Sequence, residues 1–309
     1  MQSGSALSPW AIASDSVLHS RNLAKALRCP DEVDKNSVMV DCIRQRSVDD
    51  IIAVDLKVPN HLTAFGPVID GIVIPNEPSV LMSDYNSYYG NYDLLFGVTK
   101  IEAYNQFTAQ DERHGIDPQR RDRLLRTLVR NLFSYHLQVK DTDWTHLLST
   151  QKKLDFPLPF LPVLPFLSFF FHSLCYSLNA FVCNSKEIFL TIVNEYTDWT
   201  RPALHPISTF DAIADSFGDA LIVAPIIRAG LMHAKVRKST YFYNFAYQTE
   251  EGDFSPRSGC IHGQDLAYLL GAPLVSGMQL SFFSSNYSGG ERTLSEIVMT
   301  YWTNFAKTG

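Results

Sequence analysis

Residues 156–178 constrain the chain more than any other segment, because these 23 consecutive residues come only from Phe, Pro, Leu, Ser, Val, His, Cys and Tyr. A first interpretation is a transmembrane helix. Four prolines between positions 157 and 165 argue against it, since each removes a backbone donor and clashes with the preceding turn. The proline-free stretch 166–182 has 17 residues, fewer than the roughly 20 apolar residues that a spanning helix needs. We therefore expect no membrane span here.

The composition of this segment is better explained at the level of the gene. Every residue in it except Val163 has a codon that can begin with a pyrimidine, as in a translated polypyrimidine tract. Gln138-Val139-Lys140 can be encoded by CAG-GTA-AAG, which is a splice donor sequence, and the codon of Lys186 can end in the AG of an acceptor. We interpret residues 139–186 as a retained intron that is read in frame. An alternative exon is the other interpretation.

The helical pattern on either side of this segment is consistent with its removal. Apolar residues before it, such as Leu132 and Leu137, continue into Ile188 and Ile192 with helical spacing when position 138 is joined to 187. The pattern predicts one amphipathic helix from about residue 123 to residue 196 of the joined chain. Residues 1–138 and 187–309 would then form one domain, and residues 139–186 would be an insertion in it.

Elsewhere the pattern predicts helices that alternate with strands. Apolar residues recur with helical spacing in three segments, 15–29, 47–57 and 123–138, and most clearly in 294–305, with Gly309 placed to end that helix. Residues 93–98 form a short apolar run typical of a buried parallel strand, and 239–247 alternates as a strand does. The alternation indicates the α/β class.

Composition excludes some classes of protein. The 26 Lys and Arg residues against 32 Asp and Glu give a net charge of −6, and no Lys/Arg cluster is evident, so we expect no nucleic-acid binding. The first residues lack the basic and apolar regions of a secretory signal peptide. No metal site is predicted, because none of the five cysteines has a zinc-ligand spacing.

Two further features bear on the cellular compartment. Cys29 and Cys42 flank a loop-like stretch, and from the residues alone they are either a disulfide of an extracellular chain or two free thiols. Asn286-Tyr287-Ser288 is a glycosylation sequon, and Asn286 is the predicted acceptor.

Two residues are candidates for chemistry. Glu102 follows the predicted strand 93–98, where α/β folds place functional groups, and His262 lies in a glycine-flanked loop. An acid followed by a histidine matches the chain order of the last two members of a hydrolase triad. No G-x-S-x-G motif occurs, so the nucleophile is missing, and a solvated glutamate with a loop histidine is the alternative.

Several stretches share one resemblance. They are 2–7, 65–71, 92–97, 194–199, 240–243, 262–263 with 271–274, and 298–309. They resemble the cholinesterase-like domain of the neuroligins, within the type-B carboxylesterase family, and cover nearly the whole chain except 139–186. The resemblance implies a partial α/β-hydrolase fold. It corresponds to the C-terminal half, without the N-terminal strands and the nucleophile elbow.

The resemblance implies adhesion and not catalysis. Neuroligins bind neurexins through this domain and usually lack the nucleophilic serine, so Glu102 and His262 would be vestigial triad positions. Partner contacts would come from Lys100, Glu102, Tyr104 and Asn105. No cofactor is implied apart from calcium at the neurexin interface.

The resemblance also implies a disulfide between Cys29 and Cys42 and a homodimer of the full-length protein. It implies a place at the cell surface, in the postsynaptic membrane, as part of a single-pass protein. The alternative function is the C-terminal half of an active type-B carboxylesterase that hydrolyses carboxylic esters, with its serine in the missing half.

Overall fold

The computed structural model describes residues 1–13, 15–32, 35–84, 88–134, 185–200, 205–236, 239–251, 259–275 and 286–309. Nearly all of the proposed insertion, residues 139–184, lies outside the described residues, as does the apolar segment 156–178. The insertion therefore stays a prediction. Within the described ranges, no helix is both long enough and apolar enough to cross a bilayer.

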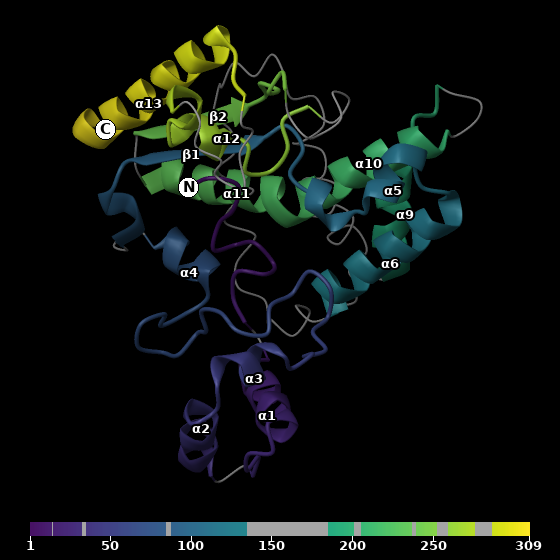
Figure 1. Cartoon of the computed structure of the whole chain (residues 1–309), viewed down its shortest axis with the longest axis vertical. Coiled ribbons are helices and arrows are strands. Elements are labelled where there is room, and N and C mark those ends of the chain that lie inside the picture. Colours follow the sequence, from purple (N-terminus) through teal and green to yellow (C-terminus); the bar gives the residue numbers. More distant parts are fainter. Residues whose placement is uncertain are drawn as a thin grey trace.

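Two parallel strands, β1 (Leu94–Thr99) and β2 (Thr240–Phe245), pair over their full length at the centre of the upper part of the molecule (Figure 1). The first residues of the chain bond to the other edge of β1. The backbone N–H of Ser3 donates to the carbonyl of Gly97 at 2.9 Å, and the N-terminal ammonium donates to the carbonyl of Leu95 at 2.7 Å. Both strands occur where the apolar run and the alternation predict them.

Helices cover both faces of this sheet. Helix α11 (Ala224–Val236) packs on one face, while α12 (Asp265–Leu269) and α13 (Gly289–Thr308) lie on the other (Figure 1). The rings of Tyr243 on β2 and Trp302 on α13 meet edge to face, 4.8 Å between centroids. This layering is that of an α/β protein, and α13 confirms the predicted C-terminal helix.

A group of helices packs beside the sheet: α5 (Ala109–His114), α6 (Pro118–Ser134), α9 (Ser185–Glu195) and α10 (Pro206–Gly218) (Figure 1). A π-helical turn, Asp219–Val223, joins α10 to α11. One hydrophobic core runs from these helices to β1, and its members include Leu125, Leu128, Val129, Ile188, Ile192, Phe210, Phe217, Phe96 and Val98.

Helices α6 and α9 are separate helices in this chain, which keeps residues 139–186, so the single helix of the joined chain stays a prediction. The guanidinium carbon of Arg126 lies 4.1 Å from the ring centroid of Phe189. With residues 139–186 removed, these two residues would be 15 positions apart, which a continuous helix would separate by about 22 Å. The two helices instead pack against each other. Helical spacing predicted correctly which faces are buried, but spacing carries no information on which helices pack against each other.

Helices α1 (Ser16–Ala26), α2 (Asn36–Arg44) and α3 (Val48–Ile52) form an arm at the bottom of Figure 1. A disulfide between Cys29 and Cys42 closes it, with 5.8 Å between the Cα atoms. The structure thus decides between the bridge and the free thiols. The arm has a small core of its own, made by Leu23, Ala24, Leu27, Cys29 and Met39.

Four short elements connect these parts: α4 (Pro78–Ser83), η1 (Tyr88–Asn91), η2 (Tyr104–Gln106) and η5 (Ala272–Leu274). The turn-rich stretch before α4 is held by Asp70, whose Oδ1 accepts hydrogen bonds from the backbone N–H groups of Ile72, Val73 and Ile74 at 2.8 to 2.9 Å.

Gly97 determines how closely β1 and β2 approach. A Cβ atom at this position would lie 2.3 Å from Cδ1 of Tyr243 and 2.4 Å from the carbonyl oxygen of the same residue. The tyrosine therefore lies directly over the backbone of β1, where only a residue without a side chain fits.

We expect that replacing both Cys29 and Cys42 by serine lowers the free energy of unfolding of the arm by roughly 3 kcal/mol, because the bridge closes a loop of 13 residues. Limited proteolysis should then cleave the arm faster than it cleaves the wild-type arm. A reducing agent should accelerate cleavage of the wild type and leave the double variant unchanged. Equal cleavage rates for the oxidised wild type and the variant would contradict the prediction.

Candidate functional site

The carboxyl end of β1 brings two distant segments together. Beyond the strand, Ile101 pairs in parallel with Ile261. The backbone N–H of Ile101 donates to the carbonyl of Cys260, and the N–H of His262 donates to the carbonyl of Ile101, both at 3.0 Å. The ladder thereby places His262 beside Glu102, although 160 residues separate them in the sequence.

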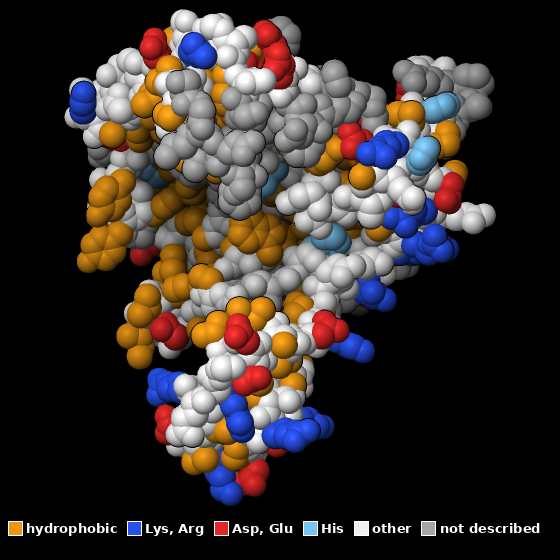
Figure 2. Space-filling view, in the orientation of Figure 1, with side chains coloured by type: hydrophobic (Ala, Val, Ile, Leu, Met, Phe, Trp, Pro, Cys, Tyr) orange, Lys and Arg blue, Asp and Glu red, His pale blue; other side chains and the backbone are white. Residues whose placement is uncertain are grey.

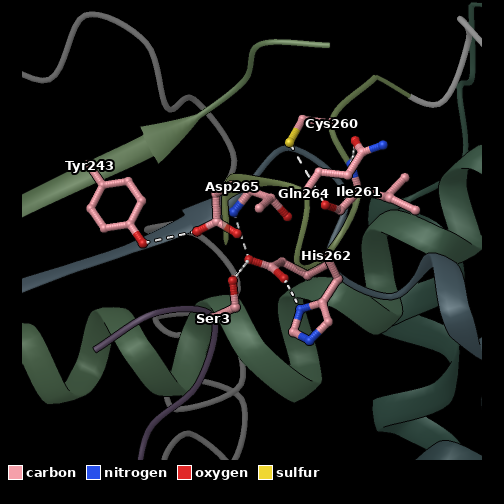
Figure 3. Close-up of polar contacts among 9 residues, drawn as sticks. Ser3, Tyr243, Cys260, Ile261, His262, Gln264 and Asp265 are labelled. Carbon is pink, nitrogen blue, oxygen red and sulfur yellow. Dashed lines mark hydrogen bonds and ion pairs between the residues drawn. The ribbon is translucent and has the colours of Figure 1, made fainter. Parts of the chain in front are cut away.

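Glu102 is 2% exposed and accepts three hydrogen bonds. Its Oε1 accepts from the hydroxyl of Ser3 and from the backbone N–H of Thr99, both at 2.7 Å, and its Oε2 lies 2.6 Å from Nδ1 of His262. Figure 3 shows Ser3 and His262 close to each other at this site, with the hydrogen bonds drawn as dashed lines. A buried carboxylate is costly without such donors, so the three bonds fix Glu102 in place.

The hydrogen bond with Glu102 raises the pKa of His262, against burial, which lowers it. The side chain of His262 is 37% exposed, whereas that of Glu102 is 1% exposed. Because Nδ1 faces the carboxylate, Nε2 is the nitrogen that could take a proton from a reactant or return it. The structure thus brings the two sequence-predicted triad positions into the geometry of an acid–histidine pair.

Figure 3 also shows a second carboxylate, that of Asp265, and a thiol, that of Cys260, in the neighbourhood of His262. Burial raises the pKa of Asp265, whose Oδ2 accepts a hydrogen bond from the hydroxyl of Tyr243 at 3.3 Å. Burial, together with the charges of Asp265 and Glu102, raises the pKa of the Cys260 thiol to about 12. Cys260 therefore stays protonated near neutral pH and cannot serve as a thiolate nucleophile.

The pair lacks a nucleophile among the described residues. The hydroxyl of Ser3 donates to Glu102 and not to the histidine. Across the described ranges, no hydroxyl or thiol is hydrogen-bonded to His262. The described part of the site can orient an imidazole and hold a proton at Nε2, but nucleophilic catalysis would need a group from elsewhere.

The four predicted partner-contact residues have different environments. Lys100 and Asn105 are exposed, and Tyr104 is half-buried at the start of η2. Glu102 is buried and fully hydrogen-bonded, so it cannot touch a partner. The prediction was wrong for Glu102, because a position at the end of a strand says nothing about whether the side chain turns inward. Lys100, Tyr104 and Asn105 remain as a possible surface.

The described residues do not fit a calcium site. No group of three or more His, Cys, Asp or Glu side chains within the described ranges could hold a metal ion. Calcium takes six to eight oxygen ligands. Lys100, Tyr104 and Asn105 offer two oxygen-bearing side chains and one cation that repels the ion. We therefore derive no role for calcium from this part of the chain.

Asn286 is exposed and lies just before α13. The serine of its sequon, Ser288, is the N-cap of that helix: its hydroxyl accepts from the N–H of Glu291, whose carboxylate accepts from the N–H of Ser288 at 2.7 Å. The sequon is thus the start of a capping box. Glycosylation of Asn286 stays a prediction.

Sequence reasoning missed Ser3, Thr99 and Asp265. Ser3 does not lie in a nucleophile elbow, and its role here is to donate a hydrogen bond to the acid. A signal was available, since a buried carboxylate must find donors and Ser3 lies in a stretch shared with the resembled family. The N–H of Thr99 and the burial of Asp265 have no sequence signal.

The sequence profile of the carboxylesterase family matches residues 1–309. The chain belongs to the carboxylesterase family. It is similar to Neuroligin-1 of Caenorhabditis elegans, with 29% identity over 99% of the chain and 34% of the relative. It is 31% identical to Neuroligin-3 of Homo sapiens, over 100% of the chain and 30% of the relative. Its identity to Neuroligin-2 of Mus musculus is 28%, over 100% of the chain and 31% of the relative.

This carboxylesterase-family chain thus spans about a third of the length of the curated relatives that it matches. The resemblance to neuroligins that the sequence motifs carried is confirmed. Membership of the family agrees with the α/β layering and with the parallel strands β1 and β2.

We expect the Glu102→Gln substitution to lower the pKa of His262, because it removes the anion that stabilises the imidazolium. The folded-state pKa is raised, so the protonated pair stabilises the fold below the ordinary pKa of histidine, and this stabilisation is lost as pH rises through the raised value. NMR titration of the His262 ring measures the shift.

The matched control is Ser3→Ala, which removes one hydrogen bond from Glu102 but keeps the negative charge. In this variant the pKa of His262 should not fall. Titration curves of His262 that coincide in the wild type and in Glu102→Gln would show that the pair is not coupled as described.

Proposed function

We propose that the chain is part of a neuroligin-like cell-adhesion protein that does not catalyse. The observation that carries the proposal is the similarity to several neuroligins over 99 to 100% of the chain. The site is compatible with it, because the acid–histidine pair has no nucleophile among the described residues. On this proposal Glu102 and His262 are kept for structure, since their bonds join three segments of the chain.

The proposed partner is a neurexin, which would contact the exposed residues beside the acid: Lys100, Tyr104 and Asn105. Lys100 and Asn105 project from the segment that follows β1, so their positions depend on the same ladder that fixes Glu102. Any calcium at this interface would have to be held largely by groups outside these residues.

Other parts of the proposal concern the whole protein. The full-length protein would be a homodimer at the cell surface, in the postsynaptic membrane, anchored by a single span. The disulfide between Cys29 and Cys42 supports an oxidising compartment, and glycosylation at Asn286 would fit the same compartment.

A second function, hydrolysis of carboxylic esters, is favoured by one specific observation. Glu102 and His262 have the distance and orientation that a triad requires, and the pKa of His262 is raised. A serine supplied from elsewhere to Nε2 would complete an esterase.

One preparation assayed twice separates the two functions. The secreted protein should bind an immobilised neurexin ectodomain, and the Lys100→Glu/Asn105→Asp variant should weaken this binding about tenfold, because two contacts are lost or made repulsive. The same preparation should hydrolyse a chromogenic ester no faster than buffer. Arg44→Glu on α2 is the control, because it also makes the chain more negative but lies far from the proposed surface.

Ester turnover that disappears in the His262→Ala variant would reject the adhesion proposal and support the esterase. Neurexin binding that is identical in the wild type and the Lys100→Glu/Asn105→Asp variant would reject the proposed surface.

We also propose that residues 139–186 are absent from the functional protein. The packing of α6 on α9 supports this proposal. Arg126 and Phe189 are in contact, so the two helices are already neighbours and a short turn between them could replace the 48 residues.

Sequencing of cDNA across codons 130–195 should find transcripts that lack 144 nucleotides and stay in frame. Proteins made from the two forms provide the matched comparison, and the shorter one should be secreted in larger amounts because it lacks a long apolar segment. Finding only transcripts that keep the 144 nucleotides would refute the retained intron.

A further inference from the structure

Helix α6 has one face in the core and one face covered with arginine. Leu125, Leu128 and Val129 are buried against α9 and α10. Arg123, Arg126 and Arg130 are exposed and follow each other at spacings of three and four residues, so they lie on one face of the helix. Figure 2 shows Lys and Arg side chains along the side of the molecule where Figure 1 draws α6.

These three arginines have no carboxylate partner among the described residues. The two arginines before them do. Arg120 pairs with Asp111 at 2.8 Å, and Arg121 pairs with Asp122 at 2.8 Å. Within the described ranges, none of these three permanent positive charges is in a salt bridge, although the net charge of the chain is −6.

Two of the three arginine side chains have contacts that order them before any ligand binds. The guanidinium of Arg126 stacks over the ring of Phe189, which holds its plane against α9. Nε of Arg130 donates to Oδ1 of Asn131 at 3.4 Å. From Arg123 to Arg130 the row extends about 10 Å along the helix axis. Ordering these side chains beforehand lowers the entropy lost when a ligand binds.

We propose that the row Arg123, Arg126 and Arg130 is a docking site for an acidic segment of a partner protein. Guanidinium groups bind carboxylates with two parallel hydrogen bonds, and the same helix already holds the carboxylates of Asp111 and Asp122 through Arg120 and Arg121. An extended acidic segment places successive carboxylates along a line, which matches a row on one face of a helix.

A membrane surface is a poorer partner for this face. A helix that lies on a bilayer buries large apolar side chains in the interface. Among the described side chains of α6, none of the large apolar ones is exposed. The face is polar and cationic, so charge complementarity is the recognition that it offers. The inference does not depend on the adhesion proposal.

A fluorescent hexaglutamate peptide tests the proposal by anisotropy at low salt. The wild-type chain should bind it, and the Arg123→Gln/Arg126→Gln/Arg130→Gln variant should bind at least about tenfold more weakly. The matched control is Arg44→Gln/Arg46→Gln/Lys57→Gln, which removes the same charge from exposed residues in or next to the arm and should bind like the wild type. A hexaglutamine peptide should not bind to any of them.

Chemical protection gives a readout that does not need a variant to fold. The peptide should protect Arg123, Arg126 and Arg130 from phenylglyoxal, and leave Arg44 and Arg46 reactive. Equal peptide affinity for the wild type and the α6 variant, or no binding at all, would overturn the proposal. So would protection by heparin or by anionic vesicles without protection by the peptide. Neurexin binding and ester turnover are separate readouts. A negative result with the peptide therefore does not affect the proposed adhesion function, and a negative result with neurexin does not affect the proposed docking site.

Discussion

The buried carboxylate of Glu102 is the constraint around which the described structure is organised. A carboxylate that is 2% exposed needs hydrogen-bond donors, and here they come from the first residues of the chain, from the end of β1 and from the loop of His262. Each donor segment is also held by backbone bonds to β1 or to its extension. The sheet therefore positions the donors, and the carboxylate in turn links the three segments through its hydrogen bonds.

This arrangement explains why an acid and a histidine can persist where no reaction is needed. In a hydrolase the acid orients the histidine, and the histidine activates a serine. In this chain the acid also bonds to Ser3 and to the backbone of Thr99, so its loss would leave a buried hydroxyl and a buried N–H without an acceptor. These bonds give the pair a role in folding that is independent of catalysis, so its presence alone is weak evidence for catalysis.

The sequence predicts those parts of the fold in which one periodicity dominates. The apolar run of β1, the alternation of β2 and the spacing of α13 all led to the observed element. The packing of α6 against α9 could not be predicted, because helical spacing does not say which helices pack together. In the site, Glu102 and His262 could be predicted from chain order. Donation to an acid leaves no motif, so Ser3 could have been found only from the need of a buried carboxylate for donors. The arginine row of α6 could not be predicted from a run of charges, because its members are three and four positions apart and become neighbours only on a helix.

Gly97 has a consequence for how this sequence can change over time. Three atoms of Tyr243 occupy the space of a side chain at position 97, and one of them is a backbone oxygen. A smaller residue at position 243 would relieve only the contact with the ring. The backbone oxygen stays whatever residue occupies position 243. A second substitution at position 243 therefore cannot make room for a side chain at position 97, as it can when two side chains are in contact. Gly97 can therefore be replaced only if the backbone of β2 shifts away from β1. Trp302 of α13 would have to shift as well, because its ring contacts Tyr243 on β2.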